Sequence, residues 1–175
     1  MFQEKGFEKT SVNDILKIVG IAKGTFYYYF KSKEEVLEAV VSEATSLLKA
    51  RVQKVVKSTS DPKTKLLEAF QSMNITDVYG GNLLKDMHKP KNALLHQKSL
   101  QAILQEMTPL LTAIIEEGVQ QGQFDCPYPK QLIQIILVAV ATLFDEGIFQ
   151  LDKQEEEQLL EAFQFLLFRQ LGIEN

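Results

Sequence analysis

Apolar residues recur at helical spacing along almost the whole chain. Between residues 33 and 58 they are separated mainly by three, four or seven positions, which predicts one long amphipathic helix. Asp61 and Pro62 then provide an N-cap and a first-turn proline for a second helix, expected to continue to about residue 74. No run of alternating β-branched residues stands out, so the pattern predicts an all-α fold.

The second half of the chain alternates between loops and longer helices. Gly80, Gly81 and Pro90 interrupt the region 75–92, where we expect a loop with one short helix. Pro109 lies inside the next helical pattern and is expected to kink it, and Gly122 is suited to follow that helix's C-terminus. The expected helices of this half cover about 82–88, 93–121, 130–149 and 153–171.

The first 33 residues differ from the rest of the chain because their helical pattern is broken into two short pieces, which Gly20 separates. Two short helices joined by a tight turn that contains glycine are typical of a helix-turn-helix. Thr10 and Ser11 can cap the first piece, and Asp14 follows Ser11 at the spacing of a capping box. The residues expected to face inward are Val12, Ile15, Leu16 and Val19 in the first piece, and Ile21, Ala22, Phe26 and Phe30 in the second.

The other face of the second piece carries groups that suit contact with a nucleic acid. Lysine and tyrosine side chains can reach phosphate oxygens, glycine allows close approach of the backbone, and threonine offers both a hydroxyl and a methyl group. Exposing three consecutive tyrosine rings to solvent alone would be unfavourable, but amphipathic rings suit contact with the sugar-phosphate backbone of a nucleic acid. The residues of this face are Lys23, Gly24, Thr25, Tyr27, Tyr28 and Tyr29.

The segment MFQEKGFEKTSVNDILKIVGIAKGTFYYYFKSKEEVLEAVV resembles the DNA-binding domain of TetR-family transcriptional regulators. The shared features are G-F before a T-S cap, D-I in the first piece, the V-G-I turn and K-G-T-F-Y-Y-Y-F-K-S-K-E-E. The resemblance implies a phosphate contact by Ser11 and by Lys33, and a weaker role for Asn13 in reading a base. It also implies that DNA is contacted by the six residues of the face described above.

The family's pattern also implies a basic arm and a full first helix ahead of Gly6 and Phe7, whereas the sequence starts with Met1-Phe2 at that place. Without most of that helix, we expect Phe2, Phe7, Ile15 and Phe30 to lose packing partners. Burying a large apolar side chain contributes roughly 1.5–3 kcal/mol, so we expect a DNA-binding head of lower stability.

The rest of the chain resembles the family's ligand-binding and dimerisation domains only in its architecture of long helices. Methionine and phenylalanine are common in its middle, and such side chains form adaptable cavities. Core packing is the more frequent role of these residues, but they are the candidates for an effector pocket. The candidate pocket residues are Phe70, Met73, Met87, His88, Met107, Leu111, Phe144 and Asp145.

The last two predicted helices are apolar over more than one stripe, more than a single core of this size can cover. We therefore expect a two-fold interface in which helix pairs from two chains form a four-helix bundle. The residues expected at this interface are Ile133, Ile136, Leu137, Val140, Leu159, Phe163, Leu166 and Leu167.

Charge and composition exclude several classes of protein. The 19 Lys and Arg and 23 Asp and Glu give a net charge of −4, but residues 1–33 hold six lysines and three acids. The remaining 13 basic and 20 acidic residues leave a charge of −7 outside this basic head. One cysteine excludes a disulfide framework, and the two histidines lack the spacing of a zinc motif, so we expect neither metal nor cofactor. No apolar run reaches the ~18 residues of a membrane span, and no signal peptide is evident, which favours a cytoplasmic protein.

These observations predict a helix-turn-helix head at 1–41, with its motif at about 11–30, followed by an antiparallel helical effector and dimerisation domain at 42–175. We expect a homodimeric transcriptional regulator, a repressor by resemblance, that binds a palindromic double-stranded DNA operator and a small-molecule effector. An all-helical carrier of small molecules without DNA binding is the alternative. The hypothesis of an enzyme that uses His88 or Asp145 has no support, because the sequence contains no nucleophile–base spacing. We therefore expect no enzymatic activity.

Overall fold

Helices account for most of the part of the chain that the computed structural model describes, residues 1–145 and 147–173. Ten α-helices and one short 3₁₀ helix occur within these residues, and no strand does, so the predicted all-α class is confirmed. Among the described helices, none combines the length and the apolar character needed to span a membrane. The chain forms two compact units, which are described one at a time.

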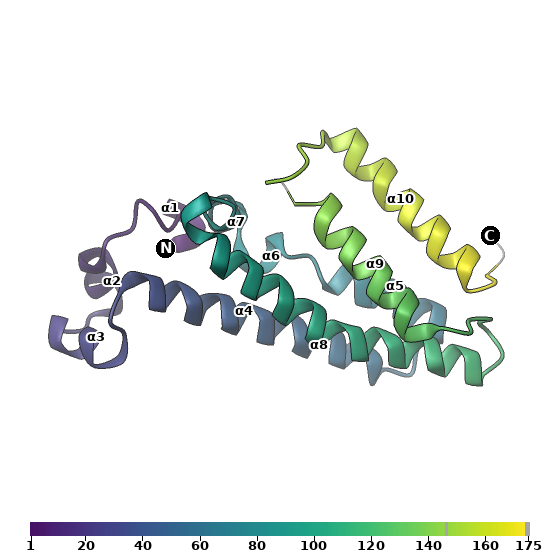
Figure 1. Ribbon diagram of the computed structural model, residues 1–175. Helices are drawn as coiled ribbons and strands as arrows, with labels where there is room; N and C mark the ends of the chain where they lie inside the picture. The colour runs from purple at the N-terminus through teal and green to yellow at the C-terminus, as the bar shows by residue number, and fades with distance from the viewer. Residues whose placement is uncertain (146, 174–175) are drawn as a thin grey trace. The chain divides into compact units, whose positions relative to one another are not determined.

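Unit 1 consists of residues 1–48 and 74–99. Figure 1 shows α1 beside α7, and these two helices are in contact. The core of the unit includes the buried side chains of Phe7, Phe26, Leu37, Tyr79 and Leu83. The elements of unit 1 are α1 (Phe2–Lys5), α2 (Val12–Val19), α3 (Lys23–Tyr29), the first part of α4 (Lys33–Val56), α6 (Thr76–Tyr79), α7 (Gly81–Met87), η1 (Pro90–Asn92) and the start of α8 (Ala93–Gln120).

Hydrogen bonds inside unit 1 connect α6 to both long helices. The hydroxyl of Tyr79 is buried and lies 3.2 Å from the hydroxyl of Thr45, 3.3 Å from that of Ser99, and 3.3 Å from the carbonyl of Val41. A buried hydroxyl with several partners avoids the cost of desolvation without a hydrogen bond. Residues 74–99 are therefore anchored to the part of α4 that directly follows the helix-turn-helix.

Unit 2 consists of residues 49–73 and 100–175, described to residue 173. It contains α5 (Pro62–Ser72), α9 (Pro129–Leu143), α10 (Lys153–Gln170) and the remaining parts of α4 and α8. The fully buried side chains of Leu66, Met107, Leu111, Ile114 and Ile133 form the centre of its core.

The helix boundaries agree with most of the predicted ones. The helix predicted at 82–88 is present as α7, and α8 continues through Pro109. The prediction that the helix from residue 130 reaches residue 149 was wrong, because α9 ends at Leu143. The carboxylate of Asp145 accepts a hydrogen bond from the amide of Gly147 at 2.8 Å, which offers the backbone a turn in place of a further helical turn.

Candidate DNA-binding site

The start of α2 is fixed by a capping box. The hydroxyl of Ser11 accepts a hydrogen bond from the amide of Asp14 at 3.1 Å, and the Asp14 carboxylate accepts from the amide of Ser11 at 2.9 Å. The side-chain hydrogen bond from Ser11, and then the backbone one, hold the pKa of Asp14 below its ordinary value. Ser11 is exposed, as its predicted phosphate contact requires, and so is Asn13.

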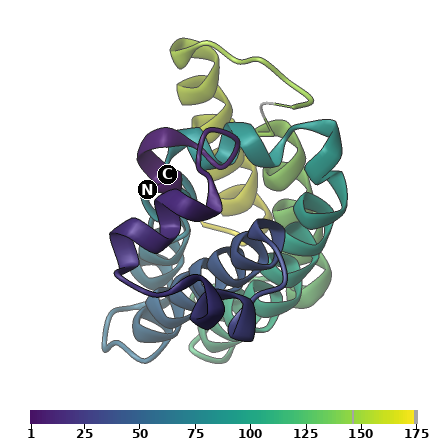
Figure 2. The ribbon, with the colours of Figure 1, turned by 90° about the vertical axis from the view of Figure 1, so that its left-hand side faces the viewer.

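A tight turn separates α2 from α3. Gly20 has a φ of 72°, in the left-handed region that glycine adopts most readily, and its amide closes α2 on the carbonyl of Leu16. Phe26 then anchors α3, since its side chain is only 1% exposed. Figure 2 looks toward the end of unit 1 that carries α2 and α3. The predicted succession of two short helices around Gly20 is therefore present.

One face of α3 is open to solvent, and we call it the recognition face. Tyr28 is the most exposed of its three tyrosines at 82%, and its ring packs edge-on against that of Tyr29 with centroids 4.9 Å apart. A Cβ atom built on Gly24 would meet no other atom within 4 Å, so another molecule has room to approach the backbone there. The recognition face consists of the exposed residues Lys23, Gly24, Thr25, Tyr27, Tyr28 and Tyr29.

Lys33 differs from the other predicted DNA contacts because its ammonium group is engaged within unit 1. Its Nζ donates a hydrogen bond to the carbonyl of Phe7 at 2.9 Å and lies 4.1 Å from the centroid of the Phe7 ring. The side chain is half-buried. A phosphate contact by Lys33 remains a prediction, and in this structure the residue connects the start of α4 to the segment that follows α1.

The apolar residues of the head are arranged differently from the prediction in two respects. Val19 and Ala22, predicted to face inward, are exposed because both flank the turn: Val19, at 59% exposure, is the last residue of α2, and Ala22 is the N-cap of α3. Conversely, Phe2, Phe7 and Ile15 were expected to lose packing partners, but all three are buried. The rings of Phe2 and Phe7 pack edge-on with centroids 5.4 Å apart, and the contact between α1 and α7 provides further cover.

Comparisons with known proteins identify the family. Residues 1–40 match the family described as "Bacterial regulatory proteins, tetR family", and residues 75–166 match "Tetracyclin repressor-like, C-terminal domain". The second match alone covers more than half of the chain. The chain belongs to the TetR family. Its recognition face therefore lies within the residues that match the family's N-terminal domain.

Individual members of the TetR family show the same relationship. The chain is 36% identical over 132 residues to the transcriptional repressor KstR2 of Mycobacterium tuberculosis, a match that covers 71% of this chain and 64% of KstR2. It is 30% identical over 124 residues to the fatty acid metabolism regulator protein of Bacillus subtilis, with 69% of this chain and 63% of the relative covered. The chain thus spans less than two thirds of the length of these curated relatives.

A solved TetR-family structure has the same fold. The regulator PfmR from Thermus thermophilus matches with a TM-score of 0.58 and 27% identity, covering 97% of this chain and 93% of PfmR.

The predicted pocket residues of this TetR-family chain are divided between the two units. Met87 and His88 belong to unit 1, whereas Phe70, Met73, Met107, Leu111, Phe144 and Asp145 belong to unit 2. Met87, Met107, Leu111 and Asp145 are buried, and Phe70, Met73, His88 and Phe144 are half-buried. Their assignment to one effector pocket remains a prediction.

The residues predicted at the dimer interface differ in burial, and only some of them reach the surface of the chain. Ile133, Ile136, Leu137 and Leu167 are buried within the chain itself, so they are not available to a partner as they stand. Val140, Leu159 and Phe163 are half-buried, and Leu166 is 51% exposed. The apolar side chains that do face outward on α9 and α10 are Ile135, Val138, Leu160, Phe165 and Leu166.

A set of polar residues in α7 and η1 contacts the segment after α1, and the sequence did not predict this contact. The carboxylate of Asp86 accepts hydrogen bonds from the amides of Phe7 and Glu8, which are almost 80 positions away in the sequence. Spacing within one helix cannot reveal a contact of this range. The sequence signal that could have drawn attention to the region is the glycine directly before Phe7; in the structure this Gly6 has a φ of 79°.

Proposed function

We propose that this chain is a ligand-responsive transcriptional repressor that binds a palindromic DNA operator as a homodimer. The observation that carries the proposal is the recognition face, where three exposed tyrosines, a lysine, a threonine and a glycine stand on the second helix of a helix-turn-helix. In this motif the second helix enters the major groove, where its side chains reach base edges and phosphates. The names of the relatives, repressor and regulator, support the same activity and no enzymatic one.

An apolar surface supports the homodimer. Ile135 of α9 is 67% exposed, and Leu160 and Phe165 of α10 are 56% and 49% exposed. Several large apolar side chains exposed on helices of one unit are typical of an interface with another protein. A second copy of the chain would cover this surface symmetrically, and its two recognition helices would face successive major grooves about 34–36 Å apart.

A small apolar molecule is the class of effector that the proposal includes. Because one relative is named a regulator of fatty acid metabolism, fatty acids of different chain length are the first effectors to test. An effector can change DNA affinity only when it binds the DNA-bound and DNA-free conformations with unequal affinity. An operator-binding regulator of this kind acts where the bacterial chromosome lies, so the proposal places the protein in the cytoplasm.

The test begins with selection of bound duplexes from a randomised pool by the full-length chain, followed by fluorescence anisotropy. A sequence-selective duplex whose affinity falls steeply with salt is the expected result. Tyr28→Ala should weaken binding to the palindrome about 30- to 150-fold, because a contact worth roughly 1–1.5 kcal/mol is removed on each of the two half-sites. Tyr128 is 67% exposed in unit 2, so Tyr128→Ala is the matched control and should bind as the wild type does. Binding that is weak, equal for all duplexes and insensitive to Tyr28→Ala would refute the proposal.

A further inference from the structure

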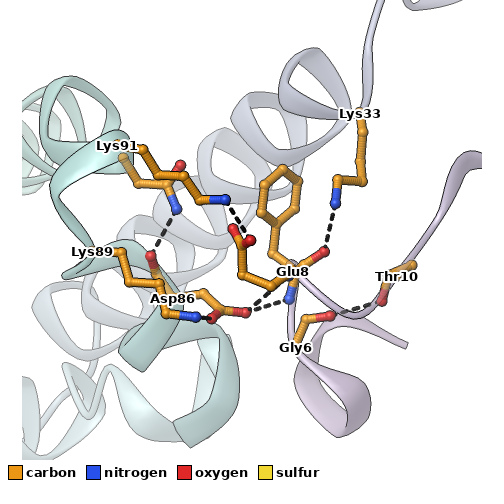
Figure 3. Close-up of polar contacts among 9 residues, drawn as sticks. Gly6, Glu8, Thr10, Lys33, Asp86, Lys89 and Lys91 are labelled. Atoms are coloured by element: carbon orange, nitrogen blue, oxygen red, sulfur yellow. Dashed lines mark hydrogen bonds and ion pairs between the residues drawn. The ribbon is translucent and has the colours of Figure 1, made fainter.

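The segment from Gly6 to Thr10 links α1 to α2, and most of its backbone polar groups have partners within unit 1. Figure 3 shows the arrangement. The amide of Phe7 donates to Oδ2 of Asp86 at 2.5 Å, and the amide of Glu8 donates to the same oxygen at 3.2 Å. One carboxylate oxygen of α7 therefore holds two successive amides of the segment that leads into the helix-turn-helix.

Asp86 is itself fixed on several sides. Its other carboxylate oxygen, Oδ1, accepts from Nζ of Lys89 at 2.5 Å, and its carbonyl accepts from the side-chain amide of Asn92 at 2.7 Å. Burial acts to raise the pKa of Asp86, but the hydrogen bonds from Lys89 and from the amides of Glu8 and Phe7 outweigh it, and the pKa lies below its ordinary value. The residue is thus a carboxylate at neutral pH.

The peptide group between Phe7 and Glu8, whose amide donates to Asp86, is held at its carbonyl by a residue at the start of α4. Lys33 donates to the carbonyl of Phe7, as described above, and Thr10 closes the segment by donating from its hydroxyl to the carbonyl of Gly6 at 2.7 Å. Gly6 allows the close approach, because a Cβ atom at this position would lie 2.7 Å from Oδ2 of Asp86. Asp86 and Lys33 therefore hold the peptide group between Phe7 and Glu8 from its two sides, one from α7 and the other from α4.

Two flanking contacts extend the same connection. The side-chain amide of Asn82 donates to the carbonyl of Glu4 at 2.9 Å, and Lys91 forms an ion pair with Glu8. Residues 82–92 thus contact the segment 4–8 through side chains spread along α7 and η1. These contacts lie in unit 1 and connect residues that match the family's N-terminal domain with residues that match its C-terminal domain.

We propose that Asp86 is a positioning residue for DNA binding, which fixes the helix-turn-helix on α7 by holding the amides of Phe7 and Glu8. The inference rests on the proposed function, since it assumes that α2 and α3 bind DNA. Asp86 touches no DNA in this scheme. It acts through the segment 6–10, whose geometry sets the direction in which α2 and α3 leave α1. Loss of the carboxylate would leave buried amides without their acceptor and would let the head turn relative to α7.

The test compares Asp86→Ala and Asp86→Asn in the full-length chain with the wild type. Asn keeps one acceptor oxygen but not the charge, so its defect should lie between those of Ala and the wild type. Asp77→Ala is the matched control, because Asp77 is an exposed aspartate of α6 in the same unit. All measurements are made at a temperature where circular dichroism shows that every variant is folded.

Two duplexes separate positioning from simple destabilisation of the head. One is the full palindrome that the wild type selects from a randomised pool, and the other has one half-site scrambled. A head that is folded but free to turn fits a single half-site yet no longer fits two at a fixed spacing. Asp86→Ala should therefore weaken binding to the palindrome at least about tenfold while changing half-site binding less than about threefold. Wild-type affinity for the palindrome, or equal loss on both duplexes, would overturn the inference.

A second measurement does not depend on DNA. Spin labels on cysteines that replace Lys17 of α2 and Lys85 of α7, both exposed, report the distance between these helices in a Cys126→Ser background. The distance distribution should be narrow with Asp86 present and broader in Asp86→Ala. An unchanged distribution would refute positioning by Asp86. Failure of the wild type to select any duplex would refute the proposed function alone, and the spin-label result would then decide on the role of Asp86.

Discussion

A buried ion pair in unit 2 permits a prediction about stability in which the two partners are not equivalent. Nζ of Lys65 on α5 lies 2.9 Å and 2.8 Å from the two carboxylate oxygens of Glu117 on α8. The Lys65 side chain is only 6% exposed, whereas that of Glu117 is 31% exposed. Removing Glu117 therefore leaves a charge with almost no access to water, and removing Lys65 leaves a charge that water can still reach.

The two single substitutions should differ in their cost. Glu117→Leu leaves the Lys65 ammonium buried and unpaired, which should lower the free energy of unfolding by about 3–5 kcal/mol. Lys65→Met retains most of the apolar stem, and Glu117 keeps a hydrogen bond from the side-chain amide of Gln121 at 3.1 Å. Its cost should be about 1 kcal/mol, the net contribution of an ordinary hydrogen bond. The double variant should be close to the wild type, because neither charge remains to be buried.

Urea unfolding of the full-length chain, followed by circular dichroism at one fixed protein concentration, measures all three variants. The fixed concentration matters because association of the folded chain would shift the midpoint. The double-mutant cycle should give a coupling energy of about 4–6 kcal/mol, mainly from rescue of Glu117→Leu by Lys65→Met. Equal costs for the two single variants would contradict the asymmetry derived from their exposure. Additive losses in the double variant would show that the pair carries no coupling.

Two further predictions concern packing and pH. Gly118→Ala should lower the free energy of unfolding by about 1–3 kcal/mol, because a Cβ atom at this position would lie 2.1 Å from the ring of Phe124. Gly81→Ala is the control in the same urea assay. Because a Cβ atom at position 81 has open space, this variant should be neutral or mildly stabilising. The pKa of Asp86 is lowered from 3.8, so its stabilising contribution is complete above that pH and is lost as the pH falls through the lower folded-state value. Acid titration followed by circular dichroism should therefore show a smaller loss of stability below about pH 4 in Asp86→Asn than in the wild type, and equal losses would contradict the assignment.

The local patterns of the sequence were sufficient for most helix boundaries and for the recognition face. Capping by Ser11 and Asp61 and the left-handed glycine at position 20 are properties of neighbouring residues, so they are visible in the sequence itself. α9 illustrates the limit of periodicity, because its apolar pattern continues past the point where the helix ends. Just beyond that end, the carboxylate of Asp145 accepts from the amide of Gly147, a turn that apolar periodicity does not predict.

The contacts of the head with residues 82–92 could not have been predicted in the same way. Asp86 lies between Lys85 and Met87, and its partners in the head are the backbone amides of Phe7 and Glu8, which leave no mark on the sequence. Similarly, α9 and α10 are apolar on more than one side, so periodicity alone does not tell which side faces inward. Burial shows that Ile133 faces the core and Ile135 the solvent, although the sequence pattern did not distinguish them.

The contacts of Asp86 and Lys91 with the segment 6–10 have a consequence for protein engineering. A chimera that joins residues 1–41 to the effector domain of another regulator would carry the recognition face but lose the acceptor of the Phe7 and Glu8 amides and the partner of the Glu8 carboxylate. The transferable module is unit 1, in which residues 74–99 accompany the helix-turn-helix although they are distant in the chain. A graft of this head onto another effector domain should therefore exchange two separate stretches of sequence together.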